Sequence, residues 1–545
     1  MMDFINPRFD NRYDLAKTVM TTSPQISLIG VLDKLKNILG PDSVIEDLAE
    51  REYFSQDYYN KAEPVAAVIR PKTVESLSTA VKNLSEIGVA MFPRGGGYSY
   101  TDAYLPTKSP GVCIDTKALN KILHVDEQDM YITAEAGCTW AQLEDHLSPL
   151  GLRTPFWGPL SGRSATLGGG ISQGSVSLGS GKYGSSGEST LSLDVVMADG
   201  TIIKTGSAGQ EQHSPFFRHY GPDLTGLFCN DAGALGIKAR VTLRLQKRRP
   251  LVHGLSFGFD GFEALVKAMG EIARLNIATE NSGMTLSALR SATKTQSLSE
   301  DVKILLEVAR SGPNVLGSSM RAIKMAIAGR QYISDSHSTA NFIVEGHNRS
   351  HLYGQLKSVR SVASNFGVEI PNTLPTVMRA NPFADYDVLD PDGRRQLPMH
   401  GVFPYSRVNN FNEQYLALIA RHKRDMETCG VTQISVYSAI STNGFLFEPV
   451  LIWLDTVEEF HRRHTSQTIL AKVKATEANE PARKLVSKMR AEIVDLMYRS
   501  GGVHLQIGKV YPYMRDRDAT QKKILKDFKN AIDPMGLFNP GALGL

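Results

Sequence analysis

Two glycine-rich segments hold the residue types best suited to binding a charged ligand. They read PRGGGYSYTD at residues 93–102 and TLGGGISQGSVSLGSGKYG at residues 166–184. Glycine lets the backbone adopt left-handed conformations and brings its N–H groups close to a phosphate. One such segment is equally typical of a surface loop. Two of them, each following a run typical of a strand, favour a cradle for a phosphate-bearing ligand.

The second segment also contains a motif similar to nucleotide-binding signatures. Gly179–Gly184 fits the pattern G-x-G-x-x-G and includes Lys182, as a P-loop does. The dinucleotide motif, however, needs a helix that begins at its last glycine, and the P-loop needs Ser or Thr after the lysine. Here a strand-like run, SSGESTLSLDVVMADG, comes next, and Tyr183 follows the lysine. We therefore exclude both interpretations.

The residues around these segments predict two kinds of architecture. From residue 64 to residue 245, short apolar runs such as GVCIDT and MYITAEAG alternate with glycine-rich turns and predict strands. From residue 250 to residue 495, longer helical patterns such as GFEALVKAMGEIARL alternate with strands such as VTQISVYSAI, which is typical of an α+β domain on an antiparallel sheet. The expected divisions are a helical N-terminal segment at 1–60, a ligand-cradle domain at 61–248, the α+β domain at 249–495 and a C-terminal segment at 496–545.

Length and composition limit the classes of protein. The 545 residues exceed one ordinary core, so we expect at least two domains. The net charge of +4 comes from 60 basic and 56 acidic residues without a Lys/Arg block, so nucleic acid is not an expected partner. No apolar run is long enough to span a bilayer, and the N-terminus lacks the apolar core of a secretory signal. Four scattered cysteines suit neither a disulfide framework nor a zinc site. We expect a cytoplasmic protein without a bound metal.

Five segments that follow one another along the chain carry a family resemblance. They are PRGGGYSYTD, ATLGGGISQG, LDVVMADGTIIKTG, GPDLTGLFCNDAGALGI and LKDFKNAIDPMGLFNPGALG. Together they resemble the FAD-binding fold shared by vanillyl-alcohol oxidase, 4-cresol dehydrogenase and the D-lactate and glycolate dehydrogenases. The resemblance implies an α+β fold: a two-part, PCMH-type FAD-binding domain completed by the C-terminal tail, with an α+β cap domain built on an antiparallel sheet. It covers the FAD-binding domain and the tail well and the cap only loosely.

The resemblance also implies which residues hold FAD. The first glycine segment would wrap the pyrophosphate, the second would lie along the flavin and its ribityl chain, and the GALGI stretch would hold the adenosine end. The implied cofactor-binding residues are Arg94, Gly95, Gly96, Gly97, Tyr98 and Ser99, then Thr166, Leu167, Gly168, Ser172 and Tyr183, and finally Gly233, Ile237 and Asn539.

In such a fold the cap and the tail close over the flavin. The implied catalytic residues are His504, Glu448, Tyr98 and Tyr405, and the implied substrate-binding residues are Arg407, Lys509 and Gln506. Glu448 lies in the apolar run FLFEPVLIW, where a buried carboxylate must be paired, neutral or functional. His504 alternates with Val503 and Leu505, as on one face of a strand, where a hydrogen-bonded core histidine and a general base are both compatible with the pattern.

The positions that anchor flavin covalently in the family differ here. Tyr98 stands where one branch has a histidine in the first loop, and Phe447 stands near the place of the cap histidine of vanillyl-alcohol oxidase. We therefore expect dissociable FAD, with a tyrosine link from the cap kept as an alternative.

The substrate motifs of the family are incomplete. Tyr98 matches the phenolate-binding tyrosine of the phenol oxidases, but their Tyr-Arg pair falls on Gly501-Gly502 and their catalytic aspartate falls on Thr166. The metal motif of the 2-hydroxy-acid branch is absent. The nearest histidine pair is in His461–His464, which follows VEEF and predicts a solvated helix.

The resemblance implies an FAD-dependent oxidase or dehydrogenase that removes a hydride from a CH–OH or benzylic C–H group. The preferred substrate is an aromatic alcohol or a para-substituted phenol. The alternatives are a 2-hydroxy-acid dehydrogenase, with Arg407 or Lys509 anchoring the carboxylate, and a flavin-binding subunit that passes electrons to a cytochrome. A further alternative function is a catalytically silent binding protein with the same fold. A homodimer is a possible assembly.

Overall fold

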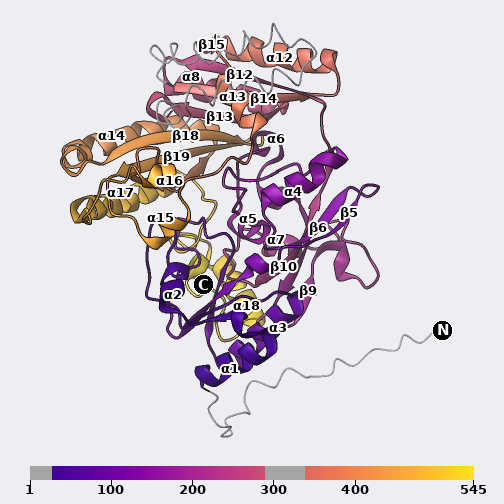
Figure 1. Ribbon diagram of the computed structural model, residues 1–545. Helices are drawn as coiled ribbons and strands as arrows, with labels where there is room; N and C mark the ends of the chain where they lie inside the picture. Colours follow the sequence, from indigo (N-terminus) through magenta and orange to yellow (C-terminus); the bar gives the residue numbers. More distant parts are fainter. Residues whose placement is uncertain (1–26, 289–337) are drawn as a thin grey trace.

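The computed structural model describes residues 27–288 and 338–545. Figure 1 shows two parts, one above the other. The lower part, which we call the base, contains the elements up to residue 248 and the C-terminal tail. The upper part, the cap, contains the long strands and helices that follow. Within the described ranges, no helix is long and apolar enough to cross a membrane, and no cluster of histidine, cysteine and acidic residues could hold a metal ion.

The first sheet of the base leads directly into the first glycine segment. Its strands follow the order β1 (Val44–Ile45), β2 (Ala67–Ile69), β4 (Gly111–Asp115) and β3 (Ala90–Arg94). Strands β2 and β3 both run parallel to β4, with helix α3 (Val74–Glu86) between them in the chain. Helices α1 (Leu28–Leu39) and α3 contribute side chains to the same core as these strands. Because β3 ends at Arg94, its carboxyl end opens into Gly95–Gly97.

The second sheet of the base is antiparallel and supports the second glycine segment. Its order is β5 (Ile122–Asp126), β6 (Tyr131–Glu135), β10 (Ile237–Arg244), β8 (Thr190–Val196) and β9 (Ile202–Lys204). Helices α4 (Trp140–Leu147) and α5 (Leu167–Gln173) pack into its core. Thr166 caps α5 by accepting a hydrogen bond from the Gly169 N–H, so much of the second glycine segment is helical. Short elements complete the base: α2 (Leu48–Phe54), α6 (Ser180–Tyr183), α7 (Leu224–Leu227), β7 (Leu152–Arg153) and β11 (Gln246–Lys247).

The cap is built on one antiparallel sheet. Its strands are β12 (Leu251–Phe259), β13 (Ala278–Thr285), β14 (Ser338–Gly346), β15 (Val368–Ile370), β16 (Arg395–Pro398), β17 (Gly401–Phe403), β18 (Thr432–Ile440) and β19 (Gly444–Trp453). Its longer helices are α8 (Phe262–Leu275), α12 (Arg349–Ala363), α14 (Tyr405–Cys429) and α17 (Glu480–Arg499), and its shorter ones are α13 (Thr373–Ala380), α15 (Glu459–Arg463) and α16 (Gln467–Leu470). The α+β class and the antiparallel cap sheet predicted from the sequence are confirmed.

Side-chain alternation along β19 separates two environments. Phe445 and Phe447 pack on aromatic rings of α8 and α14, including Phe262 and Phe411. The residues between and after them, Leu446 and Glu448, face the opposite side of the sheet, because successive side chains of a strand alternate. That side faces the base.

The C-terminal tail returns to the base, as the fold class predicted. In Figure 1 its helix α18 (Ala519–Ile532) lies among the first elements of the chain. The Met91 N–H of β3 donates to the Leu537 carbonyl at 2.8 Å. The buried Lys529 ammonium donates to the Ala234 carbonyl at 2.6 Å. The tail therefore braces two parts of the base that lie beside the glycine segments.

Candidate functional site: a cavity between the base and the cap

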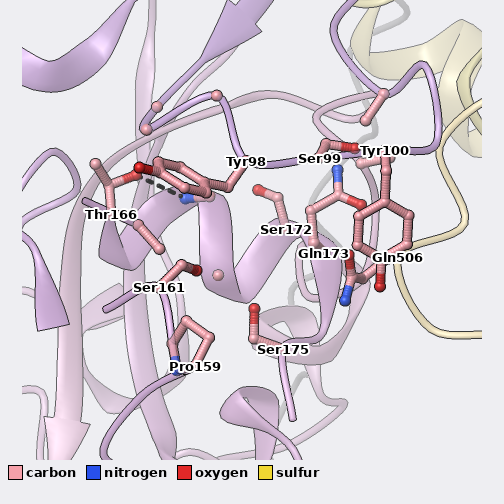
Figure 2. A pocket seen from close by; sticks show the side chains of 18 of the residues that line it. Tyr98, Ser99, Tyr100, Pro159, Ser161, Thr166, Ser172, Gln173, Ser175 and Gln506 are labelled. Atoms are coloured by element: carbon pink, nitrogen blue, oxygen red, sulfur yellow. Dashed lines mark hydrogen bonds between the residues drawn. The ribbon is translucent and has the colours of Figure 1, made fainter. Parts of the chain in front are cut away.

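One cavity is lined by both glycine segments and by the cap sheet (Figure 2). In Figure 2, Tyr98 and Ser99 of the first segment and Ser172 of α5 lie around the same space. The lining of the base includes Arg94, Gly95, Gly96, Gly97, Tyr98, Ser99, Thr166, Gly168, Ser172, Gly233, Ile237 and Lys238. The lining of the cap and its neighbours includes Tyr386, Pro398, His400, Val436, Leu446, Glu448 and Gln506.

The two glycine segments approach each other too closely for side chains. A Cβ atom on Gly95 would collide with the Thr166 hydroxyl, and one on Gly96 would collide with the Ser164 carbonyl. Gly95 therefore leaves room for the Thr166 side chain, and Gly96 leaves room for the backbone that leads into the second segment. Together the segments form one continuous wall of the cavity.

The first segment offers hydrogen-bond donors that the protein itself does not use. Within the described residues, the backbone N–H groups of four consecutive positions have no acceptor: Gly96, Gly97, Tyr98 and Ser99. Successive free N–H groups of this kind form a concave anion site. The N–H groups at the start of α5 are occupied instead, since Leu167 donates to Cys138 and Gly168 donates to Ala136. The first segment is thus the part of the cavity that suits a phosphate.

Arg94 supports this part of the cavity from below. Its guanidinium lies 4.5 Å from the ring centroids of both Tyr53 and Phe54 and 5.0 Å from that of Tyr104. It makes no ion pair with another described residue, although its side chain is buried. A Cβ atom on Gly97 would strike this guanidinium, so the loop bends around it. The positive charge therefore lies beneath the free N–H groups and favours an anion there.

The third wall comes from residues 232–238. Gly233 has a φ of +73°, and a Cβ atom there would lie 2.7 Å from the Pro93 ring. Lys238 lines the cavity, but its ammonium is paired with the buried Asp231 carboxylate. The pair neutralises this lysine, so the wall adds little net charge.

Glu448 lies at the cap end of the cavity without a partner. Among the described residues, no side chain or backbone group forms a hydrogen bond or an ion pair with its carboxyl group. Burial raises the pKa of Glu448 to about 7. A carboxyl group with such a pKa exists in both protonation states near neutral pH and can therefore take or give a proton.

His400 lines the same end and was not among the residues predicted from the sequence. Its Nε2 lies 2.6 Å from the Leu505 carbonyl, which only accepts hydrogen bonds, so Nε2 carries the proton. Its Nδ1 then accepts from the Tyr100 hydroxyl at 3.3 Å. Burial lowers the pKa of His400 to about 3, so the ring is neutral. The signal was a polar residue between the apolar stretches LPM and GVF, the same kind of signal that pointed to Glu448.

The positions of His461 and His464 contradict a prediction from the sequence. The segment His461–His464 was predicted to be a solvated helix, but His461 is only 3% exposed. His464 is hydrogen-bonded on both sides: its Nδ1 lies 3.1 Å from the Tyr98 hydroxyl and its Nε2 lies 2.8 Å from the Tyr53 hydroxyl. The buried ring of Phe460 turns this short helix inward, which explains the error. Tyr98 at the cavity wall is thereby fixed by a neutral histidine, since burial lowers the pKa of His464 to about 3.

Several predicted catalytic and substrate residues lie outside the cavity. Tyr405 packs against Gly270 of α8, on the helix-covered side of the cap sheet. Arg407 is exposed beside Gly501. His504 stacks on Tyr511 at 4.0 Å and donates through Nδ1 to the His400 carbonyl, so it lies behind His400.

Lys509 does not reach the cavity either. Its ammonium donates to the carbonyls of Asp102, Ala103 and Leu105 and to the Asn539 side chain. These four acceptors occupy the group and fix the loop after the first glycine segment. Gln506 does line the cavity, where its N–H donates to the Gln173 carbonyl at 2.7 Å.

Three predicted cofactor residues support the walls rather than line them. Leu167 is buried in the core of the second sheet. Tyr183 lies near Arg153, with 5.8 Å between the guanidinium and the ring. The Asn539 amide donates to the carbonyls of Ala103 and Ala232, both at 2.6 Å, and these two residues do line the cavity.

Comparisons with known proteins agree with an FAD site in this part of the chain. Residues 65–206 match the family described as FAD binding domain. The chain is 31% identical over 223 residues to the mitochondrial D-lactate dehydrogenase [cytochrome] of Arabidopsis thaliana, which is 40% of this chain and 37% of that protein. It is 28% identical over 248 residues to glycolate oxidase subunit GlcD of Bacillus subtilis, which is 45% of this chain and 51% of that protein. The chain thus matches about half or less of the length of these relatives. The predicted cofactor, FAD, is confirmed.

Solved structures show the same fold over nearly the whole chain. A p-cresol methylhydroxylase with bound substrate has a TM-score of 0.69 at 16% identity, covering 94% of this chain and 96% of that one. A 4-ethylphenol oxidase from Gulosibacter chungangensis has a TM-score of 0.67 at 15% identity, covering 96% and 98%. An alkyldihydroxyacetonephosphate synthase has a TM-score of 0.67 at 17% identity, covering 95% and 86%. These TM-scores show a PCMH-type fold. The sequence identities are too low to indicate the substrate.

Proposed function

We propose that this protein is an FAD-dependent oxidoreductase that takes a hydride from a carbon bearing the polar head group of a small aromatic substrate. One observation carries the proposal: a single cavity joins the free N–H groups of Gly96–Ser99 to a cap end that holds an unpaired carboxyl group, Glu448. FAD supplies the hydride acceptor when it is bound. The residues that would hold it are those of the first glycine segment, Gly168 and Ser172 of α5, and Gly233 and Ile237.

Glu448 has the properties needed to move the proton that accompanies hydride loss. Its side chain points into the cavity from β19, and its pKa of about 7 lies near the operating range of a general base. The ionised carboxylate accepts the proton of the substrate head group. Tyr100, held by His400 Nδ1, orients the substrate beside it, while the cap sheet excludes water.

The cap end favours a substrate that is not an anion. Of the described residues that line the cavity, the basic ones are Arg94, Lys238 and His400. Arg94 lies under the first glycine segment, Lys238 is paired with Asp231, and His400 is neutral. The apolar and aromatic lining, with Val436 and Leu446, suits a ring. An aromatic alcohol therefore fits this end better than a carboxylate does.

A 2-hydroxy acid is the second candidate substrate, because the relatives quoted above include a D-lactate dehydrogenase and a glycolate oxidase subunit. Its weakness lies in the missing anchor: Arg407 is exposed outside the cavity, and Lys509 is occupied by four acceptors. The name of the Arabidopsis thaliana relative includes the word cytochrome. A cytochrome partner for this protein is proposed from that name alone.

A panel of substrates under anaerobic conditions tests the proposal. The purified yellow protein is mixed with benzyl alcohol, a para-alkylphenol and D-lactate, and loss of flavin colour is followed. We expect aromatic members to bleach the flavin and Glu448→Gln to bleach slowly. Arg407→Gln is the matched control, because it removes a charged side chain outside the cavity, and it should behave as the wild type. Bleaching by D-lactate alone would replace the aromatic substrate with the second candidate.

A further inference from the structure

The cap end contains a group of aromatic rings that hydride removal does not by itself require. Six tyrosines of the described ranges line the cavity. The ring of Tyr104 packs on Arg94, the ring of Tyr437 packs on Phe262 and Phe447, and the other four are Tyr58, Tyr98, Tyr100 and Tyr386. The rings of Tyr58 and Tyr100 lie 6.1 Å apart at 77°, and those of Tyr98 and Tyr386 lie 6.2 Å apart at 64°. We call these four residues the tyrosine box.

Glu448 lines the same cavity as this box. Burial and then the charge of Glu448 raise the pKa of Tyr386 to about 12, and the same two causes raise the pKa of Tyr100. The carboxyl group therefore acts on tyrosines from two different segments. Its own backbone neighbours in the sheet, including Val436 across the β18–β19 pair, are apolar or uncharged.

Among the described residues, no cation pairs with this carboxylate. Arg94 is enclosed by the rings of Tyr53, Phe54 and Tyr104 beneath the first glycine segment. The only other basic residues that line the cavity, within the described parts of the chain, are the paired Lys238 and the neutral His400. A desolvated carboxylate without a partner is costly, so a ligand that supplies a positive charge would be favoured.

We propose that the substrate carries a protonated amine, which pairs with Glu448 inside the tyrosine box. The inference rests on the proposed function, because it concerns the same cavity. Electron-rich aromatic faces attract cations, and an ammonium donates charge-assisted hydrogen bonds to a carboxylate. An anionic head group would add a second negative charge beside Glu448, and a neutral one would leave the charge of the carboxylate uncompensated. The substrate class is thus an arylalkylamine or an aromatic amino alcohol.

Three probes that share the 2-phenylpropan-2-yl group test this inference. They are 2-phenylpropan-2-ylammonium, 2-phenylpropan-2-ol and 2-methyl-2-phenylpropanoate, and none has a C–H bond on the carbon that bears the head group. They therefore bind without being oxidised there. Dissociation constants are measured on the FAD-loaded protein by calorimetry and by the shift of the visible flavin spectrum, at a pH where Glu448 is ionised. We expect the ammonium to bind about tenfold or more tightly than the alcohol, and the carboxylate to bind most weakly.

Variants identify the source of this preference. Glu448→Gln should remove it, and Tyr386→Leu should reduce it more than Tyr386→Phe, which keeps the ring. Asp385→Asn is the matched control, since it removes a carboxylate next to Tyr386 in the chain that is exposed and paired with Arg163. It should keep the preference.

Two results would overturn the inference: equal or tighter binding of the alcohol or the carboxylate, or an ammonium preference that survives Glu448→Gln. Failure of the proposed function is seen separately. A protein whose flavin is not bleached by any substrate disproves the oxidation, whereas calorimetry still reports the head-group preference. A flavin that is bleached normally, together with no preference for the ammonium, disproves the inference alone.

Discussion

At the scale of single residues, one carboxyl group dominates the chemistry of the cavity. Glu448 could be singled out from the sequence because it interrupts an apolar run, which a buried charge does only at a cost. Tyr386, which lines the cavity, and His464, which holds Tyr98, could not be found in the same way. Tyr386 lies in an ordinary polar stretch, and His464 meets Tyr53 across 411 positions of the chain. Contacts over such separations leave no local pattern.

The raised pKa of Glu448 predicts how flavin reduction depends on pH. The ionised form accepts the proton, so the rate of anaerobic bleaching should rise with pH through about 7 and level off above it. Glu448→Gln should lose this rise and bleach about 10²–10⁴-fold more slowly at the plateau. Stopped-flow absorbance over a pH series measures both effects. A profile that is unchanged in the variant would assign the titration to another group.

At the scale of elements, the local sequence pattern predicts where most strands and both glycine segments lie. It does not predict the conformation of every segment. TLGGGISQG forms a helix because Thr166 caps it, although three glycines disfavour helix. The run VHLQI alternates like a strand, yet only Val503 forms an isolated bridge, with Val402. A positive φ at Gln506 and at Gly508 bends the chain directly after it. The expected face for His504 therefore does not exist.

The contact between the two glycine segments predicts the effect of a single methyl group. Gly96→Ala places a Cβ atom against the Ser164 carbonyl, a backbone atom that cannot move aside cheaply. The first segment must shift, and its free N–H groups with it. We expect FAD content after purification to fall at least about tenfold, because each lost charge-assisted hydrogen bond costs about 1.5–3 kcal/mol.

The control for this prediction is Gly261→Ala. A Cβ atom at Gly261 meets no atom within 4 Å, and its backbone is extended. This variant should keep its FAD and its thermal midpoint. Full occupancy in Gly96→Ala, measured as the ratio of flavin to protein absorbance, would remove the first segment from the cofactor site.

At the scale of the whole molecule, the cavity exists because three distant parts of the chain meet. The base supplies the glycine segments, the cap supplies β19, and the tail supplies Gln506 and the bracing residue Asn539. The α+β cap could be predicted from its hydrophobic pattern, whereas the two-part base completed by the tail was implied by the family resemblance of the five motifs. The tail bends at Gln506 and Gly508, which the sequence did not predict. Because of this bend, Gln506 lines the cavity, whereas His504 and Lys509 do not.

The same geometry predicts that FAD dissociates on denaturation. Phe447 stands near the anchoring position of the family, but its ring packs on Phe411 and Tyr415 on the far side of the cap sheet. Acid precipitation should therefore release the yellow colour into the supernatant. Colour that stays with the pellet would indicate a covalent bond, and Tyr98 and Tyr386 would then be the first positions to replace with phenylalanine.

In the proposed reaction, an aromatic substrate at the cap end loses hydride while Glu448 takes its proton. Single-turnover bleaching with benzylic substrates tests it most directly, using benzyl alcohol and benzylamine with hydrogen or deuterium on the benzylic carbon. We expect slower bleaching with deuterium in the wild type and a much lower rate for both isotopes in Glu448→Gln. Flavin that stays oxidised with every benzylic substrate but is bleached by D-lactate, equally in the wild type and in Glu448→Gln, would contradict it.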